Sequence, residues 1–461
     1  MPIRRRLILA SLAIAPALVA CENGTSSELP TQTPNQSLDA QVRQAISGWG
    51  VVPILPVSTQ NPALVDLGRS LFFDKILSGN RDVSCASCHN PLSHSGDDQS
   101  LAIGTGASLA GNVRVLGADR QFTPRNAPSL FNVALGTFYV FWDGRLAAQF
   151  GPGQVRTTPD LTLPSGLSGL VAAQALIPLT NRVEMRGNVG DRDVFGAPNE
   201  LAQIADGQNA AIWDAAMQRV LAIAAYQQKF NAAFPGIPTS LLGAQHAANA
   251  IAAFEAQTFA KTNSAFDRYL GRDDNALSVD AKRGALLFFG KAGCSSCHNG
   301  ALLGAQQFAS VGVPQIGPGT GSAAPLDGGR EDQFSGAKPG TPQFLFRVAP
   351  LRNVELTAPY MHDGAYATLE AVVRHYNNAD SALKAFDASE LAPPLRAAYH
   401  GDAATISKLS AALDGRLRRP LGLTAEEQTQ LVTFLKSLTD PSVRDLSSII
   451  PTSVPSGLPI R

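Results

Sequence analysis

Apolar residues recur at helical spacing over long parts of the chain. Between residues 210 and 234 they are Ile212, Ala216, Val220, Ile223 and Tyr226, and in the alanine-rich stretch 241–259 they include Ile251, Phe254 and Phe259. Side chains spaced in this way lie on one face of a helix. Glycine and proline cluster in 151–166 and 312–342, which indicates long loops rather than strands. The pattern predicts a mainly α fold with long loops.

A further helix is predicted from the signal at its start. Thr424 and Glu427 form the capping-box pair that begins a helix, and an apolar face follows them.

With 461 residues, the chain is too long for a single hydrophobic core, so we expect at least two domains.

The N-terminus has the layout of an export signal. Three arginines precede an apolar stretch from Leu7 to Ala20, which is too short to span a bilayer. Its end, Leu-Val-Ala-Cys21, resembles a bacterial lipobox in which Cys21 is lipidated; ordinary cleavage that leaves Cys21 free is the alternative. We expect a signal peptide over 1–20 and a lipidated flexible tether over 21–38. The protein would then be periplasmic and attached to the membrane only through its lipid anchor.

Composition narrows the class of partner. Hydrophobic residues make up 44% of the chain and charged residues 16%, which excludes a disordered chain. The 37 basic and 37 acidic residues give a formal net charge of zero. A balanced charge argues against nucleic acid as a partner.

The four cysteines after Cys21 form two motifs of the same kind: Cys85-Ala-Ser-Cys88-His89 and Cys294-Ser-Ser-Cys297-His298. C-x-x-C-H is typical of c-type haem attachment, in which both thiols bond to the vinyl groups and the imidazole binds iron. A four-thiolate zinc site and a dithiol redox motif are the alternatives. Two such motifs in an exported chain favour two covalently bound haems.

The surroundings of the two motifs are alike. Gly-x-x-Leu-Phe-Phe occurs at 68–73 before the first motif and at 284–289 before the second. A proline-containing segment and then Asp-Gly follow each motif. We infer two tandem haem domains, 39–270 and 271–461; chance similarity of short words is the alternative.

Taken together, these features resemble the bacterial dihaem cytochrome c peroxidase family, which includes the MauG branch. The resemblance extends from about Leu64 to Leu438. It implies that the N-terminal haem uses hydrogen peroxide and that the C-terminal haem passes electrons to it. It also implies an external donor, either a small periplasmic cytochrome c or cupredoxin or a side chain of a partner protein.

The resemblance also identifies a peroxide pocket. Gln174, Pro178 and Glu184 match the family segment in which a Gln and a Glu act on peroxide. Cleavage of an O–O bond needs a group that moves a proton between the two oxygens, and a carboxyl can do this. On local sequence alone, a surface ion pair of Glu184 with Arg182 or Arg186 is the favoured alternative, and the match to the family segment reverses this preference.

Short sequence motifs match two other sites of the family. Trp142, in Phe-Trp-Asp-Gly, matches the tryptophan that lies between the haems, although it could also be a core aromatic residue. Asn126, Thr357 and Pro359 match the residues that bind an interdomain calcium ion, partly through carbonyl oxygens.

The chain departs from ordinary peroxidases around the first haem. The spacer between Arg145 and Gln174 is longer than usual. The histidine that caps the resting active haem in ordinary peroxidases is missing, because His94 is the only histidine between His89 and His246. His94 lies too near His89 to reach the opposite face, so we expect an open iron.

The second haem also differs in its distal ligand. Tyr376 stands at the position where ordinary peroxidases have methionine, which is the MauG pattern. A tyrosine ligand would favour the oxidised iron, whereas methionine raises the potential. His375 is the competing ligand, and a buried core tyrosine is a further alternative. A non-enzymatic dihaem electron carrier is the alternative to an enzyme.

Overall fold

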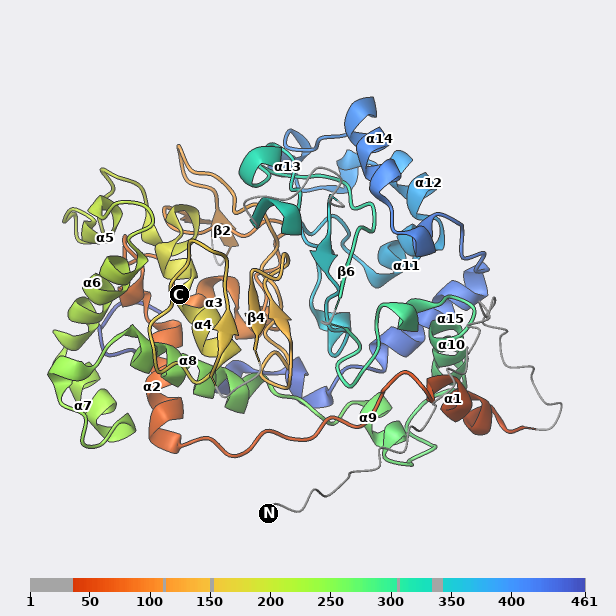
Figure 1. Cartoon of the computed structure of the whole chain (residues 1–461), viewed down its shortest axis with the longest axis horizontal. Helices are drawn as coiled ribbons and strands as arrows, with labels where there is room; N and C mark the ends of the chain where they lie inside the picture. Colours follow the sequence, from red (N-terminus) through yellow and green to blue (C-terminus); the bar gives the residue numbers. More distant parts are fainter. Residues whose placement is uncertain (1–35, 111–112, 150–152, 305–306, 334–342, 461) are drawn as a thin grey trace, which may run out of the picture. The chain divides into compact units, whose positions relative to one another are not determined.

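The computed structural model describes residues 36–460 except 111–112, 150–152, 305–306 and 334–342. Cys21, the predicted signal peptide and nearly all of the predicted tether lie outside the described residues. The prediction of a mainly helical protein is confirmed, because helices dominate and the strands have two or three residues (Figure 1). None of the described helices combines the length and the apolar character needed to cross a membrane.

The described residues before 271 form nine α-helices. They are α1 (Leu38–Ile46), α2 (Pro62–Phe73), α3 (Cys85–Cys88), α4 (Leu170–Leu176), α5 (Glu200–Gln203), α6 (Asn209–Leu221), α7 (Ala224–Ala233), α8 (Ala244–Phe259) and α9 (Ala265–Leu270). The described residues after them form α10 (Val279–Phe289), α11 (Leu369–Asn377), α12 (Ala379–Lys384), α13 (Pro393–Arg396), α14 (Ala403–Ala412) and α15 (Ala425–Lys436).

Within the described part of the chain, the strands form three small antiparallel sheets. One is the hairpin of β1 (Ser108–Ala110) and β2 (Val113–Val115). Another has the order β3 (Tyr139–Val140), β4 (Leu146–Ala148) and β5 (Val155–Arg156), and the third pairs β6 (Phe308–Ala309) with β7 (Phe346–Arg347). The prediction of a loop without strands over 151–166 is therefore wrong at β5, where pairing with β4 satisfies backbone groups that composition does not reveal.

The periodic stretch 210–234 is two helices. Ile223 is extended between α6 and α7 and ends the continuous helix that the spacing predicts. This break allows Val220 of α6 and Tyr226 of α7 both to be fully buried in the same core. The predicted capping box is present, since the Thr424 N–H donates to Glu427 Oε2 at 2.8 Å and the Glu427 N–H to Thr424 Oγ1 at 3.2 Å.

Two helix pairs pack through a glycine in the same way. α2 crosses and contacts α8, and α10 crosses and contacts α15 (Figure 1). A methyl group on Gly68 of α2 would lie 1.9 Å from the carbonyl oxygen of Ala250, and one on Gly284 of α10 would lie 2.0 Å from that of Gln430. Neither position has room for a side chain. The repeated Gly-x-x-Leu-Phe-Phe motif, which suggests a duplication, therefore corresponds to a repeated helix crossing.

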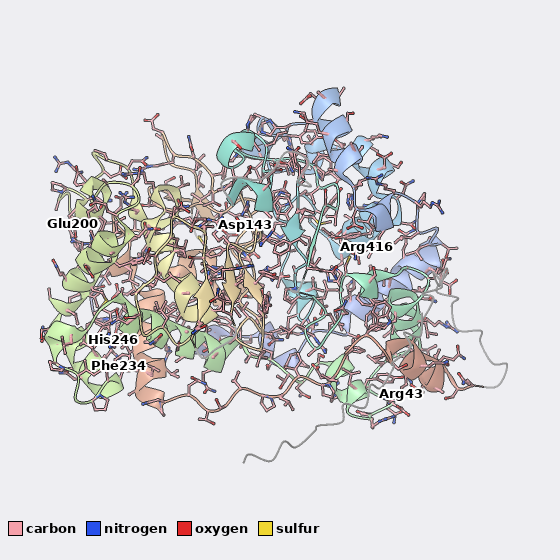
Figure 2. All side chains as sticks on the ribbon, viewed as in Figure 1. Arg43, Asp143, Glu200, Phe234, His246 and Arg416 are labelled. Atoms are coloured by element: carbon pink, nitrogen blue, oxygen red, sulfur yellow. The ribbon has the colours of Figure 1, made fainter. Side chains whose placement is uncertain are left out.

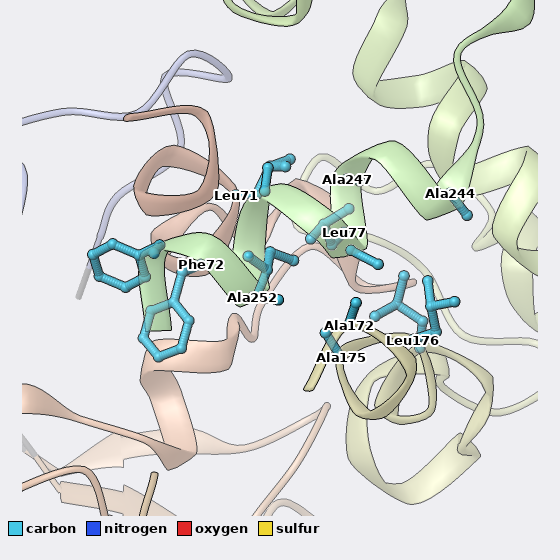
Figure 3. Packing of buried hydrophobic residues seen from close by; sticks show 14 of the residues in the cluster. Leu71, Phe72, Leu77, Ala172, Ala175, Leu176, Ala244, Ala247 and Ala252 are labelled. Atoms are coloured by element: carbon cyan, nitrogen blue, oxygen red, sulfur yellow. The ribbon is translucent and has the colours of Figure 1, made fainter. Parts of the chain in front are cut away.

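Aromatic contacts repeat at the same crossings. The ring centroids of Phe72 and Phe254 lie 5.2 Å apart, and those of Phe288 and Phe434 also lie 5.2 Å apart. Figure 3 shows Leu71 and Phe72 of α2 beside Ala252 of α8. The repeated contact makes chance similarity of the two segments a poor explanation.

Each helix pair lies in its own hydrophobic core. The first core contains α2, α4 and α6 to α8, and the second contains α10, α11 and α15. Segments at the ends of each predicted half pack in the core of the other half. α1 and α9 contribute to the second core, whereas Val443, Val454 and Leu458 contribute to the first. The domain limits 39–270 and 271–461 stay a prediction. Each predicted half contributes residues to the core of the other.

Candidate active site

The first C-x-x-C-H motif forms the short helix α3. Cys85 and Cys88 lie at the two ends of this helix, and neither forms a disulfide with a described residue. Nδ1 of His89 lies 3.2 Å from the carbonyl oxygen of Ser95, and no described residue is hydrogen-bonded to its Nε2. Burial lowers the pKa of His89 to about 4, although the Ser95 carbonyl opposes that shift. A neutral imidazole with Nδ1–H on a carbonyl presents Nε2 to a metal, which suits the residue for haem iron.

The second motif has a comparable arrangement. Neither Cys294 nor Cys297 forms a disulfide with a described residue, and Nδ1 of His298 lies 3.0 Å from the carbonyl oxygen of Leu303. Burial lowers the pKa of His298 to about 4 against the opposing effect of nearby carbonyls. Both motifs thus have the thiols and the neutral imidazole that a covalently bound haem requires.

Tyr376 of α11 lies near the second motif. Burial raises the pKa of its phenol above the ordinary value, and the Cys297 and Cys294 groups lie close enough to raise it further. No described residue forms a hydrogen bond with its hydroxyl. The side chain that aligns with the family's distal ligand is therefore half-buried near the thiols of the second motif.

His375, the competing ligand, has both ring nitrogens engaged. Its Nε2 lies 2.7 Å from the carbonyl oxygen of Val311, and its Nδ1 lies 2.9 Å from the hydroxyl of Tyr366. A neutral ring that donates from Nε2 and accepts at Nδ1 satisfies both contacts. The residue is 1% exposed, so it is a fully satisfied core histidine.

Glu184 lies in a one-turn π-helix, Arg182–Arg186, that Asn181 caps. The Asn181 side-chain oxygen accepts from the N–H groups of Val183 and Glu184, and its amide donates to Glu184 Oε1 at 3.0 Å. The Thr105 N–H donates to the Glu184 carbonyl at 2.9 Å. Backbone and carboxyl are both held in place. Sequence reasoning missed Asn181, although an Asn three residues before a Glu is a helix-start signal.

The charges around Glu184 are mixed. Burial raises the pKa of its carboxyl, Arg145 and Arg125 oppose that rise, and Asp143 adds to it. Glu184 is also near enough to Cys88 to raise the pKa of that thiol. The carboxyl thus lies beside the first motif.

The alternative surface ion pair for Glu184 is not formed. Arg182 and Arg186 both bind Asp206, at 2.8 and 2.7 Å. Arg186 is buried and also donates to the carbonyl of Leu201. Neither arginine neutralises Glu184, so its carboxyl is available for proton transfer.

Gln174 and Pro178 occupy the elements next to this turn. Gln174 is half-buried on α4, and no described residue is hydrogen-bonded to its side-chain amide. Pro178 begins the short 3-10 turn Pro178–Thr180, which packs against both α4 and the π-helix. The three predicted pocket residues therefore lie on three consecutive, contacting elements.

Trp142 links segments from the two halves. Its Nε1 donates to the carbonyl of Asn126 at 2.9 Å, and its own carbonyl accepts from the Arg347 N–H at 2.6 Å. The ring packs with Phe344 and Phe346 from the second half of the chain. The side chain is thus held by one hydrogen bond and by packing, and the backbone by a second hydrogen bond.

A buried ion network lies at the same junction, and sequence reasoning missed it. Arg125 donates to Asp327 through Nε at 2.6 Å and Nη2 at 2.9 Å, and through Nη1 to Asp143. Asp143 also accepts from Arg145 at 2.7 Å. Figure 2 shows Asp143 among side chains in the interior of the molecule. The network joins residues far apart in sequence, so spacing alone gives no signal for it.

The predicted calcium ligands are only partly brought together. Asn126 donates its N–H to the His362 carbonyl and its side-chain amide to the Gln99 carbonyl, both at 2.8 Å. The segment that contains Thr357 and Pro359 therefore ends close to Asn126. Among the described residues, no group of three or more His, Cys, Asp or Glu could hold a metal ion. A site here would depend on carbonyl and amide oxygens.

His94 has a structural contact. Its Nδ1 lies 3.0 Å from the carbonyl oxygen of Val443, in the C-terminal segment that packs on the first core. This contact supports the expectation that His94 does not cap the first haem.

Comparisons with known proteins show the family to which the chain belongs. Residues 62–275 match the family model described as di-haem cytochrome c peroxidase. The chain is 30% identical over 382 residues to methylamine utilization protein MauG of Methylorubrum extorquens, covering 81% of this chain and 86% of that protein. It is 34% identical over 327 residues to cytochrome c551 peroxidase of Pseudomonas aeruginosa, covering 70% and 73%.

Solved structures give the same result for the fold. A MauG-like protein associated with microbial copper homeostasis is 28% identical, with a TM-score of 0.56 and coverage of 88% of this chain and 97% of that one. The diheme peroxidase BthA of Burkholderia thailandensis, 21% identical with a TM-score of 0.56 and coverage of 88% and 95%, shares the fold. The chain belongs to the di-haem cytochrome c peroxidase family and is a peroxidase-type oxidoreductase of that family with two c-type haems.

Proposed function

We propose that hydrogen peroxide is reduced at a haem on Cys85, Cys88 and His89, with Glu184 as the proton-transfer group. The observation that carries this proposal is the position of the Glu184 carboxyl. It is half-buried near the first motif, held by the Asn181 amide and free of any ion pair with the neighbouring arginines. A structural carboxyl in that position would be paired or hydrogen-bonded on both oxygens.

The pocket residues divide the work by their chemistry. Gln174 holds peroxide through its amide, which has no hydrogen-bond partner among the described residues. Glu184 takes the proton from one peroxide oxygen and returns it to the other as the O–O bond breaks. The bound haem supplies the electrons for that cleavage. Two electrons and two protons convert each peroxide to two water molecules, so the remaining protons come from solvent.

The second haem is bound by Cys294, Cys297, His298 and Tyr376 in this proposal. Tyr376 is favoured over His375 because the histidine already has partners on both nitrogens. Trp142 provides the route between the haems, since it is fixed to segments of both halves. Its aromatic ring is suited to carrying an electron across the junction.

The donor is either a small periplasmic cytochrome c or cupredoxin, or an aromatic side chain of a partner protein. A tyrosine ligand together with an uncapped first haem favours the protein substrate, because such a pair could react with peroxide before any reduction. Export and lipidation at Cys21 would place the enzyme on the periplasmic side of a membrane. Retention of the wild type in membranes and release of the variant Cys21→Ser would test the anchor.

A calcium ion between the halves is the third element of the proposal. Asn126, Thr357 and Pro359 would hold it through amide and carbonyl oxygens. Its removal by a chelator is expected to lower the thermal midpoint of unfolding and to slow transfer between the haems. An unchanged midpoint after confirmed removal would leave the ion without a structural role.

The test of the proposed activity uses the diferric protein and one equivalent of hydrogen peroxide without a reductant. We expect the ferric electron paramagnetic resonance signals to be lost at both haems. Reaction only after one haem has been reduced would mean an ordinary peroxidase and a wrong Tyr376 assignment. No reaction in either state would leave the electron carrier. The matched variant Glu184→Gln should retain both haems and react slowly.

A further inference from the structure

Glu255 is a buried acid that the proposed mechanism does not use. It lies on α8, is 6% exposed, and its Oε2 has no hydrogen-bond partner among the described residues. An unpartnered carboxyl in an apolar core is costly, so its presence needs a reason. The residue lies close enough to Cys85 of the first haem motif to raise the pKa of that thiol.

The repeated helix crossing shows what the fold itself requires at this position. Gly68 packs against Ala250 and Phe254, whereas Gly284 packs against Gln430 and Phe434. Phe254 and Phe434 therefore occupy equivalent positions. The residue after each is Glu255 in the first half and Leu435 in the second.

The two residues are equally buried, since Leu435 is 7% exposed. The same crossing is thus built with an aliphatic side chain in the electron-transfer half. No carboxylate acts on Cys294, the counterpart of Cys85. Packing does not demand an acid, and the acid occurs only in the half that holds the proposed peroxide haem.

We propose that Glu255 couples proton uptake to electron uptake at the first haem. When an external donor places one electron on that haem, one proton moves from solvent onto a carboxylate oxygen of Glu255, so the net charge of the buried region is unchanged. A negative charge in a low-dielectric interior favours the oxidised haem, and its neutralisation favours the reduced haem. This inference rests on the proposed function, because it requires a haem on Cys85 and Cys88.

The charged groups around α8 leave Glu255 without a competing partner. Most charged side chains on the elements packed against α8 have other partners: Asp66 pairs with Lys229, Arg69 with the Ile449 carbonyl, Asp74 with Tyr226, and Arg219 with Glu200. Asp214 is exposed to solvent. On α8 itself, His246 accepts from the Gly243 N–H. Two other acids lie near the first motif, Glu184 and the half-buried Asp97, and both act on Cys88. Burial raises the pKa of Glu255 to about 8 and that of Asp97 to about 7.

The test is a spectroelectrochemical titration of both haems in the full-length holoprotein from about pH 5 to about pH 9, across the window in which Glu255 ionises. The variants are Glu255→Gln, which keeps the shape, and Glu255→Leu, which installs the residue of the other half. Asp97→Asn separates the second acid. We expect the wild-type potential of the first haem to fall as pH rises. Both Glu255 variants should lose most of that fall, and the second haem should not change.

Stability provides the reference for a merely structural role. The folded-state pKa of Glu255 lies above its unfolded value, so its ionisation lowers the stability of the wild type as pH rises toward 8. Glu255→Leu should remove this decline whether or not the acid serves the haem. A potential that follows the wild-type pH curve in both variants, or that changes equally at both haems, would overturn the inference. A wild type without haem on Cys85 would instead overturn the proposed function.

Discussion

The hydroxyl of Tyr366 lies 2.9 Å from Nδ1 of His375 and completes the hydrogen bonding of that buried ring. The other nitrogen is 2.7 Å from the Val311 carbonyl. To bind iron, His375 would have to give up one of these buried hydrogen bonds and leave its partner unsatisfied. Its neighbour Tyr376 makes no such bond and lies near Cys294 and Cys297.

This relationship predicts opposite results for the two neighbours. Tyr376→Phe should change the ferric spectrum of one haem only, and Tyr376→Met should raise the potential of that haem. His375→Gln should leave the spectrum unchanged and lower the free energy of unfolding by about 1–3 kcal/mol, because buried partners are lost. Ferric optical and paramagnetic resonance spectra, with chemical denaturation, would distinguish the residues. A spectral change in His375→Gln alone would reverse the assignment.

Peroxide turnover should depend on the ionised form of Glu184. Glu184→Gln is expected to lower the rate of the reaction with peroxide by about 10²–10⁴-fold, the usual contribution of a proton-transfer group. The matched control is Glu390→Gln, which changes an exposed glutamate in the other half. Stopped-flow measurements at several peroxide concentrations would compare them, and equal rates for the two variants would exclude Glu184.

The pH dependence of that rate follows from the same carboxyl. Burial raises the pKa of Glu184, so the rate should increase with pH through a midpoint above that of an ordinary glutamate. Asn181 donates a hydrogen bond that favours the ionised form. Asn181→Ala should therefore move the midpoint to higher pH. A midpoint that stays in place while the rate falls would give Asn181 a purely structural role.

The ion network at the junction should stabilise the fold. Arg125→Met leaves the buried Asp143 and Asp327 without their shared partner, so we expect a loss of about 3–5 kcal/mol in the free energy of unfolding. The matched control Arg283→Met breaks an exposed pair with Asp280 and should change stability by about 0.5 kcal/mol or less. Denaturant titration of the two holoproteins would measure both. Equal effects would show that burial of the network does not matter.

Short sequence motifs gave predictions for the parts of the candidate site that lie within one short segment. The haem motifs, the segment from Gln174 to Glu184 and the capping box at Thr424 are each defined by residues that are close in sequence. The helical spacing of apolar residues predicted the fold class. The Arg125 network and the fully bonded His375 depend on residues brought together only by the fold. The break at Ile223 also escaped prediction, because both of its helices use the same apolar spacing.

The repeated helix crossing gives a matched pair of substitutions. Gly68→Ala and Gly284→Ala each push a methyl group into a carbonyl oxygen on the facing helix, at 1.9 and 2.0 Å. The backbone must move apart in both cases, so we expect each to lower the free energy of unfolding by about 1–3 kcal/mol or more. Gly415→Ala is the control, since a methyl group there meets no atom within 4 Å. If the halves share one architecture, the two losses should be similar, and each should disturb the spectrum of the haem in its own half. A large loss at one glycine with none at the other would mean that the two crossings are not equivalent, and the comparison of Glu255 with Leu435 would lose its basis.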